Sequence, residues 1–105
     1  MMKVALPPTP ADAAERAFRV RRRDLDPLGH VNNSVYIDYL EEALEAAGHG
    51  DLVTVLPRRY EIDYVAAAER DNLLVGRTWP LDGGQAYRLS REDGTEIFRA
   101  RVSRI

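Results

Sequence analysis

The residues best suited to chemistry lie in one short stretch, DLDPLGHVNN, which occupies positions 24–33. It holds two carboxylates, an imidazole and two side-chain amides around a proline and a glycine. Pro27 fixes one backbone dihedral and Gly29 tolerates unusual ones, so we expect a turn here. A helix follows, and the free amides of its first turn would point back toward Asp26 and His30. A carboxylate, an imidazole and a positive helix end in one place can stabilise charge that develops on a reacting carbonyl.

Composition narrows the classes of protein that the chain can be. Its 105 residues suffice for one domain with a thin core. A net charge of −2 gives no bulk attraction to nucleic acid or to a membrane surface, and we expect neither as a partner. The absence of cysteine excludes disulfides and a thiolate nucleophile, and the two histidines are too far apart to suggest a metal site. We therefore expect no metal and no cofactor. Because the chain has neither a membrane-spanning apolar run nor a signal-peptide pattern, we expect a cytoplasmic protein.

The spacing of apolar residues predicts one long helix and five strands. The helix covers about 34–47 and ends at Gly48, which suits the position after a helix C-terminus. Its apolar side is formed by Tyr36, Tyr39, Leu40, Ala43 and Ala47. Alternation of apolar and polar residues predicts strands near 18–20, 60–64, 73–79, 87–89 and 98–102. A turn is expected at 80–84 and a hairpin at Asp93-Gly94.

The order of these elements predicts the fold class. A strand, a turn and a helix followed by four strands, joined largely by hairpins, is typical of an α+β domain with an antiparallel sheet. A single apolar helix in front of five strands suggests that the sheet wraps around the helix. Residues 1–15 contain three prolines and read as a tail or linker, which leaves 16–105 as the folded domain.

The motif Asp-x-Asp-x-x-Gly-His-Val-Asn-Asn-x-x-Tyr, followed by Glu-Glu-Ala, resembles the hotdog-fold thioesterases. It is most similar to the acyl-ACP thioesterases, whose second hotdog domain follows a similar proline-rich linker, and next to the 4-hydroxybenzoyl-CoA thioesterase group. The resemblance is sharp over 18–43 and looser from 58 onward. It implies a single hotdog fold, with a five-stranded antiparallel sheet wrapped around one long helix. It also implies an acyl thioesterase that hydrolyses acyl-ACP or acyl-CoA to a free acid and a thiol.

The resemblance assigns catalytic roles to Asp26 and His30, and the residue types agree. Asp26 can attack the thioester carbon or act as general base on water, or it can simply cap the turn. His30 can orient water, donate to the leaving thiolate or bind the carbonyl, or it can lock the turn. Asn32 can contact the thioester or cap the helix.

Two positions depart from the acyl-ACP pattern. Leu28 stands where those enzymes use an asparagine, and Ala67 stands where they carry a glutamate, with Glu69 two residues away as a substitute. The alternative function is therefore a catalytically weak or inactive hotdog that binds acyl carriers or serves as a dimerisation module. A hotdog dehydratase is a third possibility, but the turn around His30 argues against it.

The family also suggests how the substrate is held. Its acyl pocket forms between two hotdogs, so we expect a homodimer or a higher homo-oligomer. Asp26 of one subunit would face the corner near Tyr64 and Ala67 of the other. The expected tunnel wall consists of Tyr36, Tyr39 and Leu40. The basic run at positions 21–23 is either a solvated strand edge or a contact for the phosphates of a carrier.

Overall fold

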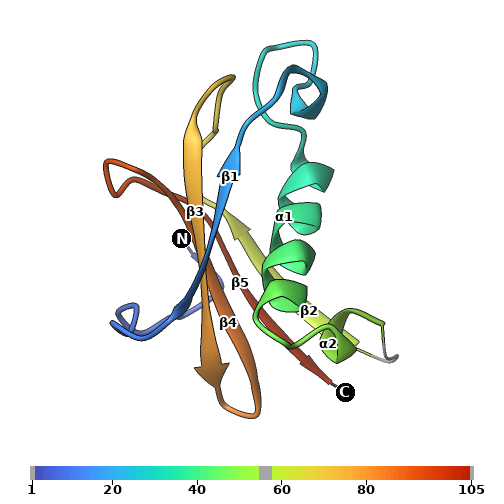
Figure 1. Cartoon of the computed structure of the whole chain (residues 1–105), viewed down its shortest axis with the longest axis vertical. Coiled ribbons are helices and arrows are strands. Elements are labelled where there is room, and N and C mark those ends of the chain that lie inside the picture. The colour runs from blue at the N-terminus through green and yellow to red at the C-terminus, as the bar shows by residue number, and fades with distance from the viewer. Residues whose placement is uncertain (1, 55–57, 105) are drawn as a thin grey trace.

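The computed structural model describes residues 2–54 and 58–104. Its elements are β1 (Ala14–Arg19), the 3₁₀ turn η1 (Arg22–Asp24), α1 (Asn33–Ala46), α2 (Asp51–Thr54), β2 (Arg58–Tyr64), β3 (Leu73–Leu81), β4 (Gly84–Arg91) and β5 (Glu96–Arg104). Neighbouring strands pair antiparallel in the order β1-β3-β4-β5-β2. The long helix α1 lies against one face of this sheet (Figure 1). The predicted α+β fold, a five-stranded antiparallel sheet around one long helix, is confirmed.

Local signals in the sequence set both ends of α1. Asn32 caps its start, because the side-chain Oδ1 accepts a hydrogen bond from the Ser34 amide at 3.1 Å. At the other end Gly48 adopts a φ of +87°, and the His49 amide donates to the Leu44 carbonyl at 2.8 Å. This is the hydrogen-bond pattern of a Schellman motif, for which glycine is the preferred residue. The predicted glycine stop is therefore correct.

The hydrophobic core lies between α1 and the sheet. The buried residues of the helix are Tyr36, Tyr39, Leu40, Ala43 and Leu44. They face alternate positions of the central strands, among them Tyr87, Leu89, Phe98, Ala100 and Val102. Leu44, and not Ala47, completes the buried side, because position 44 continues the row of positions 36 and 40 along the helix.

The basic run at positions 21–23 does not continue the first strand. β1 ends at Arg19, and the chain then turns. The Asp24 carboxylate accepts a hydrogen bond from the Arg21 amide at 2.9 Å, and the Asp24 amide donates to the Arg21 carbonyl at 2.9 Å. Of the two interpretations of this run, the strand edge was wrong, because a short aspartate-bonded turn competes with strand pairing.

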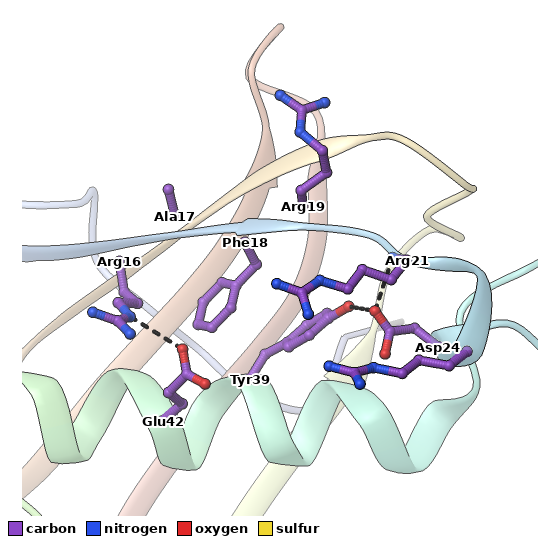
Figure 2. A pocket seen from close by; sticks show the side chains of 9 residues that line it. Arg16, Ala17, Phe18, Arg19, Arg21, Asp24, Tyr39 and Glu42 are labelled. Atoms are coloured by element: carbon purple, nitrogen blue, oxygen red, sulfur yellow. Dashed lines mark hydrogen bonds and ion pairs between the residues drawn. The ribbon is translucent and has the colours of Figure 1, made fainter.

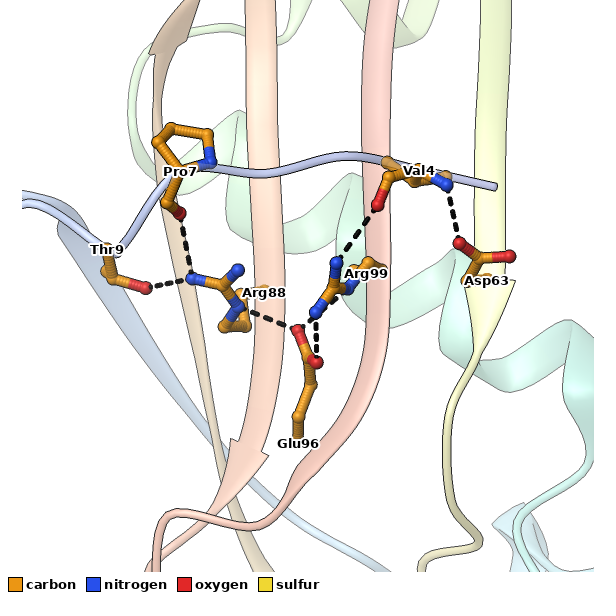
Figure 3. Close-up of polar contacts among 7 residues, drawn as sticks. All are labelled: Val4, Pro7, Thr9, Asp63, Arg88, Glu96 and Arg99. Atoms are coloured by element: carbon orange, nitrogen blue, oxygen red, sulfur yellow. Dashed lines mark hydrogen bonds and ion pairs between the residues drawn. The ribbon is translucent and has the colours of Figure 1, made fainter. Parts of the chain in front are cut away.

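The N-terminal segment lies across the face of the sheet opposite α1 (Figure 3). Val4 is 1% exposed, and its amide donates to the Asp63 carboxylate at 2.6 Å. Further along, the Arg88 side chain donates to the Thr9 hydroxyl at 2.7 Å. β1 itself begins at Ala14, inside the range 1–15 that was expected to be a tail. These residues therefore pack on the domain, because polar groups of the sheet satisfy their backbone.

The hairpin between β3 and β4 is tighter than expected. Pro80 belongs to β3, and only Asp82 and Gly83 form the turn, with φ values of +48° and +79°. Two left-handed residues are typical of a type I′ hairpin. β1 pairs with β3 only as far as Thr78, so Pro80 lies beyond that pairing and its missing amide breaks no bond on that side. The sequence has a short apolar run at 52–56 that Pro57 ends; this run begins in α2, and Pro57 lies outside the described residues.

Gly76 permits close packing between neighbouring strands of the sheet and gives a first prediction. A Cβ atom at this position would lie 2.6 Å from the Tyr87 hydroxyl oxygen, which is fully buried and has no hydrogen-bond partner among the described residues. Gly76→Ala should therefore destabilise the fold by about 1–3 kcal/mol through overpacking. Tyr87→Phe removes the nearest of three crowding atoms and leaves the ring carbons Cε1 and Cζ at 2.8 and 3.0 Å, so Gly76→Ala should cost less in that background but still destabilise the fold. Urea unfolding of the four proteins checks this, and equal costs in both backgrounds would contradict the packing argument.

Candidate active site

A cavity of about 260 Å³ lies between the turn that precedes α1 and the corner that follows β2. Its lining residues are Asp26, His30, Val31, Asn33, Tyr36, Tyr64, Val65, Ala66 and Ala67. Five of the eight predicted site residues are among them: Asp26, His30, Tyr36, Tyr64 and Ala67. The cavity therefore joins the start of the helix to the small residues of the corner, in one chain.

Asp26 is held by the turn that it belongs to. Its Oδ1 atom accepts hydrogen bonds from the Leu28 amide at 2.9 Å and the His30 amide at 3.1 Å. Gly29 adopts a φ of +81°, and its amide donates to the Asp26 carbonyl at 3.0 Å, which closes the turn. Within residues 2–54 and 58–104, no group donates to Oδ2. The carboxylate thus caps the turn with one oxygen and keeps the other free for chemistry.

The corner after β2 is fastened to the turn by backbone and side-chain hydrogen bonds. The Val31 amide donates to the Ala68 carbonyl at 2.9 Å, and the Tyr36 hydroxyl accepts from the Ala68 amide at 3.0 Å. Burial raises the pKa of Tyr36, against the lowering effect of the Ala68 amide, so this hydroxyl remains protonated. Arg91, which sequence reasoning did not identify, donates to the Ala67 carbonyl at 2.6 Å. Only the register of the β4–β5 hairpin brings this arginine to the corner.

Three predicted residues lie away from the cavity. Asn32 is the helix cap, and Asn33 takes the place on the cavity wall. The Tyr39 hydroxyl donates to the Asp24 carboxylate at 2.8 Å, and Leu40 is fully buried in the core. Both follow from the helical period, because only Tyr36 on the buried side of α1 reaches the corner.

The corner next to Asp26 belongs to the same chain, whereas we expected the corner of a partner subunit. The reason is connectivity: β2 runs directly into residues 65–68, and Val31 and Tyr36 bind them. Tyr64, which is 51% exposed, lies at the end of the edge strand β2 and lines the cavity.

Neither departure from the acyl-ACP pattern is compensated in the cavity. Leu28 is 80% exposed and does not line it. Glu69 pairs with His30 through an isolated backbone bridge, but its side chain is also absent from the lining. In the described part of the chain, Asp26 is the one carboxylate that borders the cavity.

The described residues present no cluster of three or more acidic, histidine or cysteine side chains that could hold a metal ion. Among them there is also no helix with the length and apolar character needed to cross a membrane.

Several solved thioesterases have the same fold. An acyl-ACP thioesterase from Bacteroides thetaiotaomicron is 17% identical with a TM-score of 0.75, and the match covers 98% of this chain and 42% of that one. A 1,4-dihydroxy-2-naphthoyl-CoA thioesterase from Synechocystis is 19% identical with a TM-score of 0.68, covering 86% and 78%. A Thermus thermophilus thioesterase complexed with coenzyme A is 23% identical with a TM-score of 0.66, covering 87% and 82%. The architecture is that of the hotdog-fold thioesterases.

The sequence itself decides the family. The acyl-ACP thioesterase C-terminal domain family matches residues 9–100, and the chain belongs to it. It is therefore a thioester hydrolase by family. No curated protein sequence matches the chain.

Proposed function

We propose that the chain hydrolyses acyl thioesters of acyl-carrier protein or coenzyme A in the cavity beside Asp26. The observation that carries the proposal is how the Asp26 carboxylate is hydrogen-bonded and where it lies. One oxygen is fixed by two backbone amides, the other has no donor among the described residues, and the residue lines a cavity of about 260 Å³. Membership of the acyl-ACP thioesterase C-terminal domain family supports the same reaction class.

The groups around the cavity suit each stage of the reaction. Asp26 either removes a proton from the attacking water or adds to the thioester carbon and forms an anhydride that water then cleaves. The first-turn amide of Asn33, at the positive end of α1, can stabilise the oxyanion that develops on the carbonyl. His30 can protonate the departing thiolate. The products are a free acid and a thiol, and no group remains on the protein.

Free thiol release from medium-chain acyl-CoA and acyl-ACP tests the proposal. We expect turnover with at least one of these carriers. Absence of thiol release from both, with a correctly folded protein, would favour the alternative of a non-catalytic hotdog that binds carriers or serves as a dimerisation module.

We further propose that the working form is a homodimer. β2 is an edge strand with one unpaired side, and Tyr64 at its end and Leu28 in the turn are both exposed apolar groups beside the cavity. A second copy that covers them would exclude water from the cavity. Light scattering should give a mass of about twice the 11.9 kDa of one chain. A mass equal to one chain, under conditions in which thiol is released, would contradict this.

A further inference from the structure

A second hollow, of about 350 Å³, lies between β1 and α1 (Figure 2). Four arginines line it: Arg16, Arg19, Arg21 and Arg23. Only two acidic residues, Asp24 and Glu42, share the lining. In a chain whose net charge is −2, this groove is a local concentration of positive charge. We call it the arginine groove.

The acids in the arginine groove already have partners. Glu42 pairs with Arg16 at 3.1 Å. The Oδ2 atom of Asp24 accepts from the Tyr39 hydroxyl at 2.8 Å and from the Arg21 amide at 2.9 Å. Glu42 is therefore paired within the groove, whereas Asp24 accepts only from neutral donors, and its charge offsets part of the positive charge of the arginines.

Two of the four guanidinium groups have no acceptor among the described residues. Arg19 donates to the Asp71 carbonyl at 2.9 Å. By contrast, across residues 2–54 and 58–104 no acceptor binds the guanidinium groups of Arg21 and Arg23. Each guanidinium offers five N–H donors in a planar fork that matches the oxygens of a phosphate. Two such forks on one groove are suited to a doubly charged anion.

The floor of the groove is held by packing and by a hydrogen bond. Phe18 and Tyr39 stack with ring centroids 4.7 Å apart, and the hydrogen bond from Tyr39 to Asp24 fixes the turn that carries Arg21 and Arg23. Such packing reduces the entropy lost when the arginines close on a ligand.

The arginine groove is a neighbour of the catalytic cavity. Asp24 lies two residues before Asp26, and the Tyr39 ring packs edge-on against Tyr36, which lines the cavity, at 6.4 Å. The two hollows thus lie on either side of one turn of α1. Among the described residues, no arginine or lysine lines the cavity, so the arginine groove supplies the nearby cations that the cavity lacks.

We propose that the arginine groove binds a phosphate group of the acyl carrier, with Arg21 and Arg23 as its ligands. The inference rests on the proposed thioesterase function, and it adds the means by which the carrier is recognised. The shared chemistry is a pantetheine-linked phosphate, which occurs both in coenzyme A and in the prosthetic group of acyl-carrier protein. Charge-assisted bonds from arginine to phosphate would supply affinity that falls as salt rises.

Calorimetric titration of the full chain tests this without requiring turnover. The probes are adenosine 3′,5′-bisphosphate, which represents coenzyme A, and 4′-phosphopantetheine, which represents both carriers. For the probe that binds the wild type, the double variant R21Q/R23Q should lose at least tenfold in affinity. The control R101Q/R104Q removes the same charge from two exposed ion pairs, Arg101–Asp82 and Arg104–Asp51, and should bind within twofold of wild type.

The outcomes separate this proposal from the thioesterase proposal. Loss of binding confined to R21Q/R23Q supports a phosphate site even if the wild type releases no thiol. Binding of the bisphosphate points to the adenosine end of coenzyme A, whereas binding of 4′-phosphopantetheine alone points to the pantetheine phosphate that both carriers share. Equal affinity of R21Q/R23Q and wild type, an equal loss in the control, or no binding of either probe to wild type would overturn the proposal.

Discussion

Asp26→Asn is expected to lower kcat for thiol release by at least about 100-fold, the scale on which a general base or nucleophile contributes. Asparagine keeps an oxygen that can accept from the Leu28 and His30 amides, so the turn should persist. It cannot take a proton from water or attack a carbonyl at neutral pH. Steady-state thiol release with the better of the two carriers measures the effect.

The matched control for this variant is Asp38→Asn. Asp38 lies on the exposed side of α1, so the control removes the same charge without touching the cavity. We expect its kcat to stay within about twofold of wild type, as befits an exposed charge away from the site. Equal activity of Asp26→Asn and wild type on every thioester would show that hydrolysis does not use this aspartate.

Glu96→Gln is expected to destabilise the fold by about 2–3 kcal/mol, because it removes the charge between two half-buried arginines. The Glu96 carboxylate accepts from Arg88 at 2.7 Å and from Arg99 at 2.5 Å, and its side chain is 17% exposed (Figure 3). Arg88 and Arg99 stand directly opposite each other in the register of β4 and β5. Without the carboxylate, two like charges would face each other across the strands. Urea unfolding at pH 7 measures the loss.

The effect of Glu96→Gln should depend on pH. Burial tends to raise the pKa of Glu96, but hydrogen bonds and charges from Arg99 and Arg88 outweigh it, and the pKa is lowered from 4.5. A lowered pKa in the folded state stabilises the fold above the unfolded pKa, and this stabilisation disappears as pH falls through the folded value. The difference in the free energy of unfolding between wild type and Glu96→Gln should therefore shrink below about pH 4.5.

Glu15→Gln is the control variant, since it removes a carboxylate from an exposed ion pair of the sheet. Glu15 pairs with Arg77 at 2.7 Å, but its side chain is 58% exposed. Its replacement should cost no more than about 0.5 kcal/mol. A similar loss of unfolding free energy in Glu96→Gln and Glu15→Gln would mean that burial of the Glu96 ion pairs adds no stability.

Much of the fold could be predicted because local rules and tertiary packing agree. Asn32 and Gly48 bound the helix, and Asp82-Gly83 and Asp93-Gly94 close two hairpins. The predictions of the fold that were wrong concern segments in which a side chain changed the path of the backbone. Asp24 folded the basic run into a turn. The outer-face arginines bound the proline-rich segment, which has no periodicity of its own to predict its place.

The candidate site was predicted less completely, because spacing along a helix does not reveal what lies opposite it. Asp26 and His30 share a turn, so their proximity follows from the motif. That Tyr36 and not Tyr39 borders the cavity depends on which side of α1 meets the corner. The contribution of Arg91 depends on the register of β4 and β5, which shifts at Leu89 and Ser90. Such contacts require the assembled sheet.

The most direct test is to find where a thioester binds. A thioether analogue of octanoyl-CoA cannot be hydrolysed, and its titration can be followed through the backbone amide resonances of the isotope-labelled chain. The largest changes should fall on Leu28 and His30, whose amides hold Asp26, and on Asn33 and Ala67 of the cavity wall. Saturable binding that leaves these four amides unchanged while others shift would place the substrate elsewhere and contradict a reaction at Asp26.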